Sequence, residues 1–323
     1  MSNEHKKGGG QLMAMMGIGL MLVSTLLFFM PIFFIGLLKL LPIPSWRSQC
    51  TRVIDQLVMR WCAINNLYIN TTKRTQWEFR GIDQFKANDW SMLIANHQSW
   101  LDIVVLHRLF TGKIPVIKFF IKDQLKWVPF LGFAWWAMGC PFMKRYTREY
   151  LKQNPHKQGM DLKATQKAMQ TFKSNPVTIC NFIEGTRFTP TKKAMQKSPY
   201  QYLLKPKAGG ISFVISAMNE KIHNLIDITI VYPDNNPSLW DFLCQRMEII
   251  KVHVREIPVP QEFRQEALAS DPQLQEQFRD WLNERWLEKD RLLANFKGHV
   301  GGLVNDPSFD EDLSEDEGDL SLD

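Results

Sequence analysis

The segment Ser91-Met-Leu-Ile-Ala-Asn-His-Gln-Ser-Trp-Leu-Asp102 decides the fold. A short apolar run ends at Ala95, and the polar pair Asn96-His97 follows it directly. Helix-forming residues begin near Ser99, so the segment predicts a strand, a polar turn and a helix. In α/β sheets, ligands bind at the carboxyl ends of strands, which is where this turn would place the imidazole of His97.

The carboxylate of Asp102 lies five residues after His97, on the next turn of the expected helix. From there it could accept a hydrogen bond from Nδ1 of His97, which would leave Nε2 free as a base. Neutral imidazole, with a reference pKa of about 6.5, suits proton abstraction from a hydroxyl near neutral pH. A purely structural histidine is the alternative, and the pair taken alone favours it.

A second apolar strand, Val177–Ile183, is predicted to run into the polar turn Glu184-Gly-Thr-Arg187. Arg187 can bind a phosphate bidentately, Thr186 can donate a hydrogen bond, and Glu184 could hold the arginine or a hydroxyl group. Alone, such a turn is more often plain surface than a site.

A third segment, Gly139-Cys-Pro-Phe-Met-Lys-Arg145, closes an uncharged, tryptophan-containing stretch over residues 127–143 and adds two cations. It is either a buried segment with a basic end or an acyl-chain surface beside a phosphate contact.

Several kinds of chemistry are excluded by what surrounds these segments. Ser99 sits in no G-x-S-x-G turn, and there is no P-loop or dinucleotide fingerprint. The five cysteines form no C-x-x-C pair or Cys/His cluster, so we expect reduced thiols and no metal site. We therefore expect direct attack by a substrate hydroxyl on an activated acyl group, without an acyl-enzyme intermediate.

An uncharged, mostly apolar run spans residues 11–38. As a helix its about 28 residues would reach about 42 Å, against a hydrocarbon thickness of about 30 Å. It is too long for a signal peptide and no small-x-small site follows it, so we expect a flexible stretch at 1–10 and a membrane anchor at 11–45. Because Pro31 could bend the run, a single span and a re-entrant hairpin both remain open. Basic residues after the run favour a cytoplasmic body under the positive-inside rule; they are Lys39, Arg47 and Arg52.

Charge divides the 323-residue chain unevenly. The net charge is +6, but residues 306–323 hold nine acidic and no basic residues, which leaves +15 on residues 1–305. Such a basic body suits an anionic membrane surface, a phosphorylated substrate or nucleic acid, although no recognition motif supports the last. We expect a disordered acidic tail at 301–323.

Residues 46–300 are expected to form one catalytic domain in which β-rich runs alternate with helical ones. This alternation predicts an α/β fold with a mixed, largely parallel sheet flanked by helices. A hairpin is expected from Leu67–Thr71 and Gln76–Arg80, and a last helix from Asp271 as cap to Gly298. Further strands are expected at Met92–Ala95, Val177–Ile183, Asp227–Tyr232 and Met247–Arg255, and further helices at 99–111, 159–174 and 208–219.

Taken in order, the motifs resemble the 1-acylglycerol-3-phosphate acyltransferases, the PlsC-like glycerolipid acyltransferase family. The resemblance rests on Asn96-His97-x4-Asp102 (an H-x4-D motif), Gly139-x-x-Phe142-x-x-Arg145, Glu184-Gly-Thr-Arg187 and Ile230-Val-Tyr-Pro233. It covers roughly residues 75–235. The anchor, the segment from Lys205 to Gly210 and the final Trp-rich helix are more similar to the long branch, with bacterial inner-membrane YihG-type and lysocardiolipin-type members. Tyr232 stands where many members have proline.

The resemblance implies a membrane-bound enzyme of phospholipid biosynthesis, expected at the cytoplasmic side of a bacterial inner membrane. It would transfer a fatty acyl group from acyl-CoA or acyl carrier protein to the sn-2 hydroxyl of a lysophospholipid, with 1-acylglycerol-3-phosphate as the first expectation and no cofactor. His97 is implied as general base and Asp102 as its orienting partner. The implied substrate-binding residues are Asn96, Gly139, Phe142, Arg145, Glu184, Gly185, Thr186 and Arg187. Lysophosphatidylglycerol or lysocardiolipin as acceptor, a thioesterase or lipid hydrolase with the same pair, and a non-enzymatic membrane adaptor remain open, as does the oligomeric state.

Overall fold

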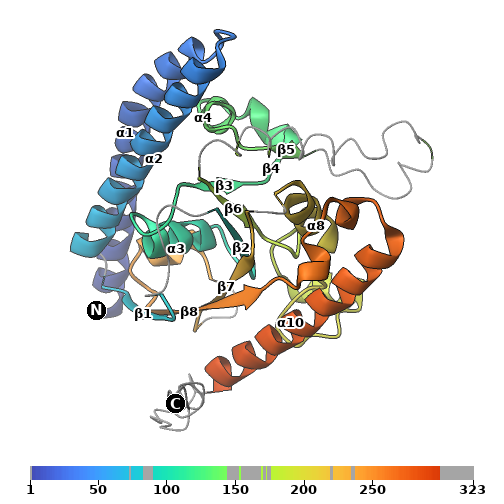
Figure 1. Ribbon diagram of the computed structural model, residues 1–323. Coiled ribbons are helices and arrows are strands. Elements are labelled where there is room, and N and C mark those ends of the chain that lie inside the picture. The colour runs from blue at the N-terminus through green and yellow to red at the C-terminus, as the bar shows by residue number, and fades with distance from the viewer. Residues whose placement is uncertain are drawn as a thin grey trace, which may run out of the picture.

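A six-stranded mixed sheet forms the centre of the protein in this computed structural model (Figure 1). Its strand order is β1-β8-β7-β2-β6-β3, and every neighbouring pair is parallel except β7 and β8. The expected α/β fold with a largely parallel sheet is therefore confirmed.

The strands are β1 Gln76–Arg80, β2 Ser91–Ala95, β3 Ile117–Phe119, β6 Thr178–Asn181, β7 Asn224–Val231 and β8 Ile249–Pro258, and a separate pair comprises β4 Ile121–Lys122 and β5 Phe142–Met143. The structure describes residues 2–72, 74–82, 90–143, 153, 169, 172, 176–218, 221–233 and 237–298.

Helices cover both faces of the sheet, because successive side chains of a strand point to opposite sides. On β2, Met92 and Ile94 belong to the core shared with α8 and α10, whereas Leu93 and Ala95 belong to the core shared with α3 and α9. The covering helices are α3 Leu101–Phe110, α8 Ala208–Ala217, α9 Leu239–Leu243 and α10 Pro272–Gly298. Shorter elements are α4 Leu131–Met138, α7 Pro190–Gln196 and the 3-10 turns η1 Asp123–Trp127, η3 Gln261–Phe263 and η4 Glu266–Ala269.

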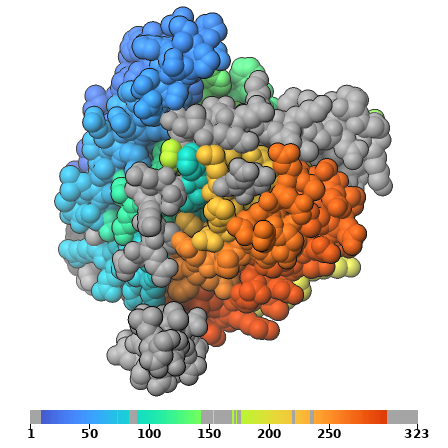
Figure 2. All heavy atoms as spheres, in the orientation of Figure 1, coloured from blue at the N-terminus to red at the C-terminus, as the bar shows by residue number. Residues whose placement is uncertain are grey.

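Two long N-terminal helices, α1 (Ser2–Leu38) and α2 (Pro44–Thr72), form an antiparallel hairpin along one side of the body (Figures 1 and 2). Helix α1 continues through Pro31 without a break. Its segment Gly10–Leu38 has a mean hydropathy of 2.5 and is a candidate membrane span, with few residues buried in the protein.

Helix α1 also contacts the body near both of its ends. At Gly10 the backbone approaches so closely that an added Cβ would lie 2.7 Å from the carbonyl oxygen of Cys244. Towards the other end, the rings of Phe33 and Phe133 have centroids 5.0 Å apart, which joins α1 to α4.

Several expectations for the N-terminal region are wrong. Residues 67–71 lie inside α2 and form no hairpin strand, because α2 buries Ile69 at helical spacing against the α3 side of the sheet. Strand β1 instead pairs in parallel with β8, far along the chain. Residues 2–10, expected to be flexible, begin α1. Most of the helix expected at 159–174 and all of the tail at 301–323 lie outside the described residues.

The last helix follows the prediction closely. The Oδ1 atom of Asp271 accepts hydrogen bonds from the backbone N–H groups of Gln273 (2.8 Å) and Leu274 (3.3 Å), so Asp271 caps the helix as expected. A fully buried pair, Lys289 Nζ and Asp227 Oδ1 at 2.5 Å, holds α10 against β7. A removed partner would leave the other charge buried and uncompensated, so this pair fixes where α10 sits.

Candidate active site

Asn96 joins the end of β2 to β7. Its amide nitrogen donates to the carbonyl oxygen of Ile230 at 2.9 Å, and its amide oxygen accepts from the N–H of Ile230 at 2.8 Å. Asn96 is 1% exposed, and these two bonds engage both ends of its amide. The resemblance implied that Asn96 binds the substrate. In the structure its side chain instead links the end of β2 to the backbone of β7.

His97 and Asp102 meet as the sequence predicts. Nδ1 of His97 lies 2.7 Å from Oδ2 of Asp102, on the first turn of α3. Since a buried carboxylate accepts hydrogen bonds, Nδ1 carries the proton and Nε2, at the far edge of the ring, is left as an acceptor. The imidazole also stacks on Phe182, with centroids 4.1 Å apart and planes at 18°. Tautomer and ring orientation are thus both fixed.

The Asp102 carboxylate is fully buried and accepts three further hydrogen bonds. The backbone N–H groups of Gln98 and Ser99 donate to Oδ2 at 2.7 and 2.9 Å, and the hydroxyl of Tyr232 donates to Oδ1 at 2.6 Å. Hydrogen bonds to a carboxylate favour its charged form and offset its burial. Burial and the nearby carboxylate raise the pKa of Tyr232 well above its usual value, so this phenol remains a neutral donor.

Glu184 supports the backbone of the reactive turn. Its Oε1 accepts from the N–H of His97 at 2.8 Å and its Oε2 accepts from the N–H of Leu204 at 2.9 Å. The side chain is fully buried, and burial raises its pKa to about 8 although both N–H groups favour the charged form. The resemblance implied that Glu184 binds the acceptor. In the structure both of its carboxylate oxygens instead accept hydrogen bonds from the protein backbone.

The three residues after Glu184 line the open end of a cavity. Gly185 has φ +72°, and a Cβ there would lie 2.9 Å from Nζ of Lys207, so the turn requires glycine. Lys192 of α7 donates to the Thr186 hydroxyl at 2.8 Å and to the carbonyl oxygen of Arg187 at 3.0 Å. The exposed Arg187 guanidinium lies 5.4 Å from the centroid of the Trp100 ring. Two cations thus stand at the mouth beside His97.

The remaining predicted motif, Gly139-x-x-Phe142-x-x-Arg145, has its described residues beside the cavity. Gly139 ends α4 with φ +79°, and Phe142 lies on β5; neither lines the cavity, although the adjacent Met138 does. Arg145 lies outside the described residues.

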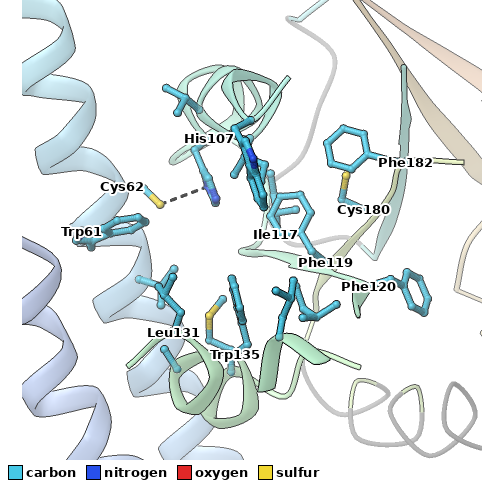
Figure 3. A pocket seen from close by; sticks show the side chains of 18 of the residues that line it. Trp61, Cys62, His107, Ile117, Phe119, Phe120, Leu131, Trp135, Cys180 and Phe182 are labelled. Atoms are coloured by element: carbon cyan, nitrogen blue, oxygen red, sulfur yellow. Dashed lines mark hydrogen bonds between the residues drawn. The ribbon is translucent and has the colours of Figure 1, made fainter. Parts of the chain in front are cut away.

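The cavity has a volume of about 690 Å³ and runs from His97 between the N-terminal hairpin and the sheet (Figure 3). Its walls are mainly apolar and aromatic, with Trp61 from α2, Phe119 from β3, and Leu131 and Trp135 from α4. A space of this size and lining suits a ligand that has a long apolar chain and a polar group at one end of that chain.

One polar pair interrupts the apolar wall. Cys62 Sγ of α2 lies 3.3 Å from Nδ1 of His107 on α3 (Figure 3). Burial raises the pKa of Cys62 to about 12 and lowers that of His107 to about 4, so both groups are neutral near pH 7. A neutral thiol of this kind is not an activated nucleophile.

Comparisons with known proteins find acyltransferases. The family model described as "Acyltransferase" matches residues 76–233. The 1-acyl-sn-glycerol-3-phosphate acyltransferase epsilon of Mus musculus is 27% identical over 227 residues, covering 63% of this chain and 57% of that protein. Lysocardiolipin acyltransferase 1 of Gallus gallus is 26% identical, covering 86% of this chain and 69% of that protein. The crystal structure of the 1-acyl-sn-glycerophosphate acyltransferase PlsC from Thermotoga maritima matches with a TM-score of 0.51 and 13% identity, covering 88% of this chain and 97% of that one.

Residues 76–233 thus match the acyltransferase family, and the fold is that of PlsC. The chain spans 57% of the length of the mouse relative. Among the residues that the structure describes, no three His, Cys, Asp or Glu side chains are grouped as metal ligands would be.

Three parts of the site were missed by sequence reasoning. Tyr232, which follows β7, was seen only as part of the Ile230–Pro233 motif, and neither it nor Lys192 of α7 was given its role in the site. Trp100 had a weak signal, since it lies within the H-x4-D segment. The hairpin wall of the cavity was likewise unexpected, because the sequence suggested an anchor separate from the domain.

Proposed function

We propose that this protein transfers a fatty acyl group from a thioester donor to the free sn-2 hydroxyl of a lysophospholipid, with 1-acylglycerol-3-phosphate as the first candidate acceptor. The observation that carries the proposal is the His97–Asp102 bond at 2.7 Å beside a long apolar cavity with two cations at its mouth. The relatives named above act on 1-acylglycerol-3-phosphate and lysocardiolipin by their names, and a Caenorhabditis elegans relative is named for lysophosphatidylinositol.

The chemistry follows from the geometry. Nε2 of His97 removes the proton as the acceptor oxygen attacks the thioester carbonyl, forming the new C–O bond. The tetrahedral intermediate then expels the thiolate as the C–S bond breaks, and the imidazolium returns its proton to the sulfur. Asp102 stabilises the imidazolium between these steps, as in other carboxylate–histidine pairs. Arg187 and Lys192 bind the phosphate and hold the hydroxyl near Nε2, which lowers the entropic part of the barrier.

The N-terminal hairpin supports a membrane setting for this reaction. Exposed apolar side chains cover the outer face of α1, and the inner face of the same helix lines the cavity. An acyl chain held in a bilayer would therefore meet the cavity wall directly. We propose a cytoplasmic side for the body because basic residues follow α1, and a bacterial inner membrane as the resemblance implies.

Two variants test the assignment. His97→Ala removes the base, and Asp102→Asn removes the charge that fixes its tautomer; each should lower kcat by about 10²–10⁴-fold. The measurement is the transfer of a labelled acyl group to lysophospholipid by purified protein in lipid, followed by mass spectrometry. Near-normal transfer by a folded His97→Ala protein would remove His97 as the base. Label appearing as free fatty acid, and not in phospholipid, would show a hydrolase instead.

A further inference from the structure

A second hollow, of about 530 Å³, lies beside the reactive turn and is separate from the apolar cavity. Helix α7, the turn that follows it and the C-terminal end of α10 form its walls. Gln98, the residue after His97, lines this hollow, whereas His97 lines the apolar cavity. The two hollows therefore meet the same short turn.

The second hollow is basic. Lys193, Lys197 and Lys297 line it, and no aspartate or glutamate among the described residues does so. Nζ of Lys193 donates to the carbonyl oxygen of Gln201 at 2.9 Å, and Nζ of Lys297 lies 5.1 Å from the centroid of the Tyr202 ring. The partner in each of these two contacts is uncharged. Such a hollow favours an anionic ligand.

Hydrogen bonds fix the backbone of the residues that line this basic hollow. The carboxylate of Asp290 on α10 accepts from the N–H groups of Gln201 at 2.6 Å and Tyr202 at 2.7 Å. Ser198 Oγ donates to the carbonyl oxygen of Leu203 at 2.7 Å. A turn fixed in this way pays little ordering entropy when a ligand binds.

The basic hollow is also coupled to the reactive turn. The N–H of Phe188, another lining residue, donates to the carbonyl oxygen of His97 at 2.7 Å. Helix α7 separates the two hollows and contributes Lys192 to the apolar cavity and Lys193 to the basic one. A ligand with one end in each hollow would pass close to His97.

We propose that the basic hollow binds the phosphorylated nucleotide of an acyl-CoA donor, and that this contact places the thioester beside His97. Coenzyme A carries a phosphorylated adenosine diphosphate at one end of a long pantetheine arm and the acyl thioester at the other. The lysines match the phosphates, and Tyr202 and Phe188 offer aromatic surface to the base. A carrier protein would instead present one phosphodiester on a broad folded surface, which needs an open face and not a hollow. The inference rests on the function proposed above.

The test compares two thioester donors on the full-length protein in lipid: palmitoyl-CoA and palmitoyl-pantetheine, which lacks the nucleotide. The double variant Lys193→Ala/Lys197→Ala should raise KM for palmitoyl-CoA about tenfold, since it removes two charge-assisted contacts. The KM for palmitoyl-pantetheine, the KM for the acceptor and kcat should not change. Lys113→Ala is the matched control, because this exposed lysine follows the far end of α3 from His97 and should leave all four values unchanged.

Direct titration with free CoA separates the two proposals, because it needs no turnover. Binding that the double variant weakens by the same factor supports the basic hollow even if transfer fails, in which case only the proposed function falls. An unchanged KM for palmitoyl-CoA and unchanged CoA binding would overturn the inference while leaving transfer itself intact. A rise in KM for the acceptor would overturn it as well. So would a rise in KM for a donor on acyl carrier protein with no rise for palmitoyl-CoA. If the double variant does not fold, the single exposed substitution Lys197→Glu must show the same selective loss.

Discussion

The carboxylate of Asp102 has four donors, and three of them come from its own turn: His97, Gln98 and Ser99. The fourth, the hydroxyl of Tyr232, comes from the end of β7, 130 positions further along the chain. It reaches Asp102 because β2 and β7 are neighbours in the sheet. The phenol thus binds the carboxylate oxygen that the turn itself leaves without a donor.

We expect Tyr232→Phe to lower kcat about tenfold, because Asp102 loses the donor that holds its Oδ1 in place. Hydrogen bonds to charged groups are worth about 1.5–3 kcal/mol, and about 1.36 kcal/mol corresponds to a tenfold change in rate. The measurement is kcat for transfer of a labelled acyl group, together with thermal unfolding.

Tyr200→Phe is the control for this prediction, because its hydroxyl donates to Asn283 at 3.3 Å, away from the site. Its kcat should match that of the unaltered protein. If Tyr232→Phe lowers the melting temperature but leaves kcat unchanged, Tyr232 only packs and does not support the His97–Asp102 pair.

The spacing of His97 and Asp102 made their contact predictable, because five positions span one helical turn from a strand end. The roles of Asn96 and Glu184 were not predictable in the same way. Both are polar residues in a functional motif, and only the sheet neighbours of their strands show that their side chains hold backbone in place. Sequence therefore located the turn correctly but not which of its polar atoms face outward.

At the scale of elements, the strands were predicted best, because β2, β6 and β7 are short apolar runs buried on both faces. Helix α2 was missed since its charges do not mark a single exposed side. Asp55 faces inward and binds the fully buried Lys118 of β3, which also donates to the carbonyl oxygen of Met138 at 2.8 Å. A buried ion pair of this kind removes the polar stripe by which a helix is recognised.

Two glycines of α1 give a matched pair for testing the packing of the hairpin. A Cβ at Gly36 would lie 2.8 Å from the ring of Phe133 and 3.2 Å from Cβ of Ala137, whereas a Cβ at Gly19 would meet nothing within 4 Å. Both changes to alanine gain helix propensity of about 1 kcal/mol. Gly19→Ala should therefore raise the melting temperature, and Gly36→Ala should lower it, since overpacking costs about 1–3 kcal/mol.

The readout for this pair is thermal unfolding in detergent, together with acyl transfer. Phe133 packs against Phe29 and Phe33 of α1, so its ring has little room to move aside. Equal shifts for the two variants would mean that α1 does not dock on α4.

At the scale of the whole molecule, α1 contacts the body close to both of its ends, at Gly10 and at Phe33. A helix held in this way cannot cross a bilayer while the body stays on one side. We therefore expect residue 11 and residue 45, which flank the apolar run, to lie on the same side of the membrane. This arrangement differs from both that the sequence left open, a single span and a bend at Pro31, because the unbroken α1 lies along the body.

Cysteine labelling measures this arrangement cleanly, because all five native cysteines are buried. Gln11→Cys and Ser45→Cys, both at exposed positions, should react with a membrane-impermeant maleimide from the same side as Ser270→Cys on the body. Labelling of Gln11→Cys only from the opposite side would establish a true span.

The order of strands sets the smallest piece of this chain that can be cut out and still fold. Strand β1 begins the segment matched by the family model, yet its neighbour in the sheet is β8, which follows the end of that segment. The N–H of Leu204 that binds Glu184 belongs to a loop to which Trp286 of α10 donates at 3.0 Å, through the Leu204 carbonyl. An expression clone trimmed to residues 76–233 would leave β1 without an edge to join and that loop without its support. Trimming should stop no earlier than the last turn of α10.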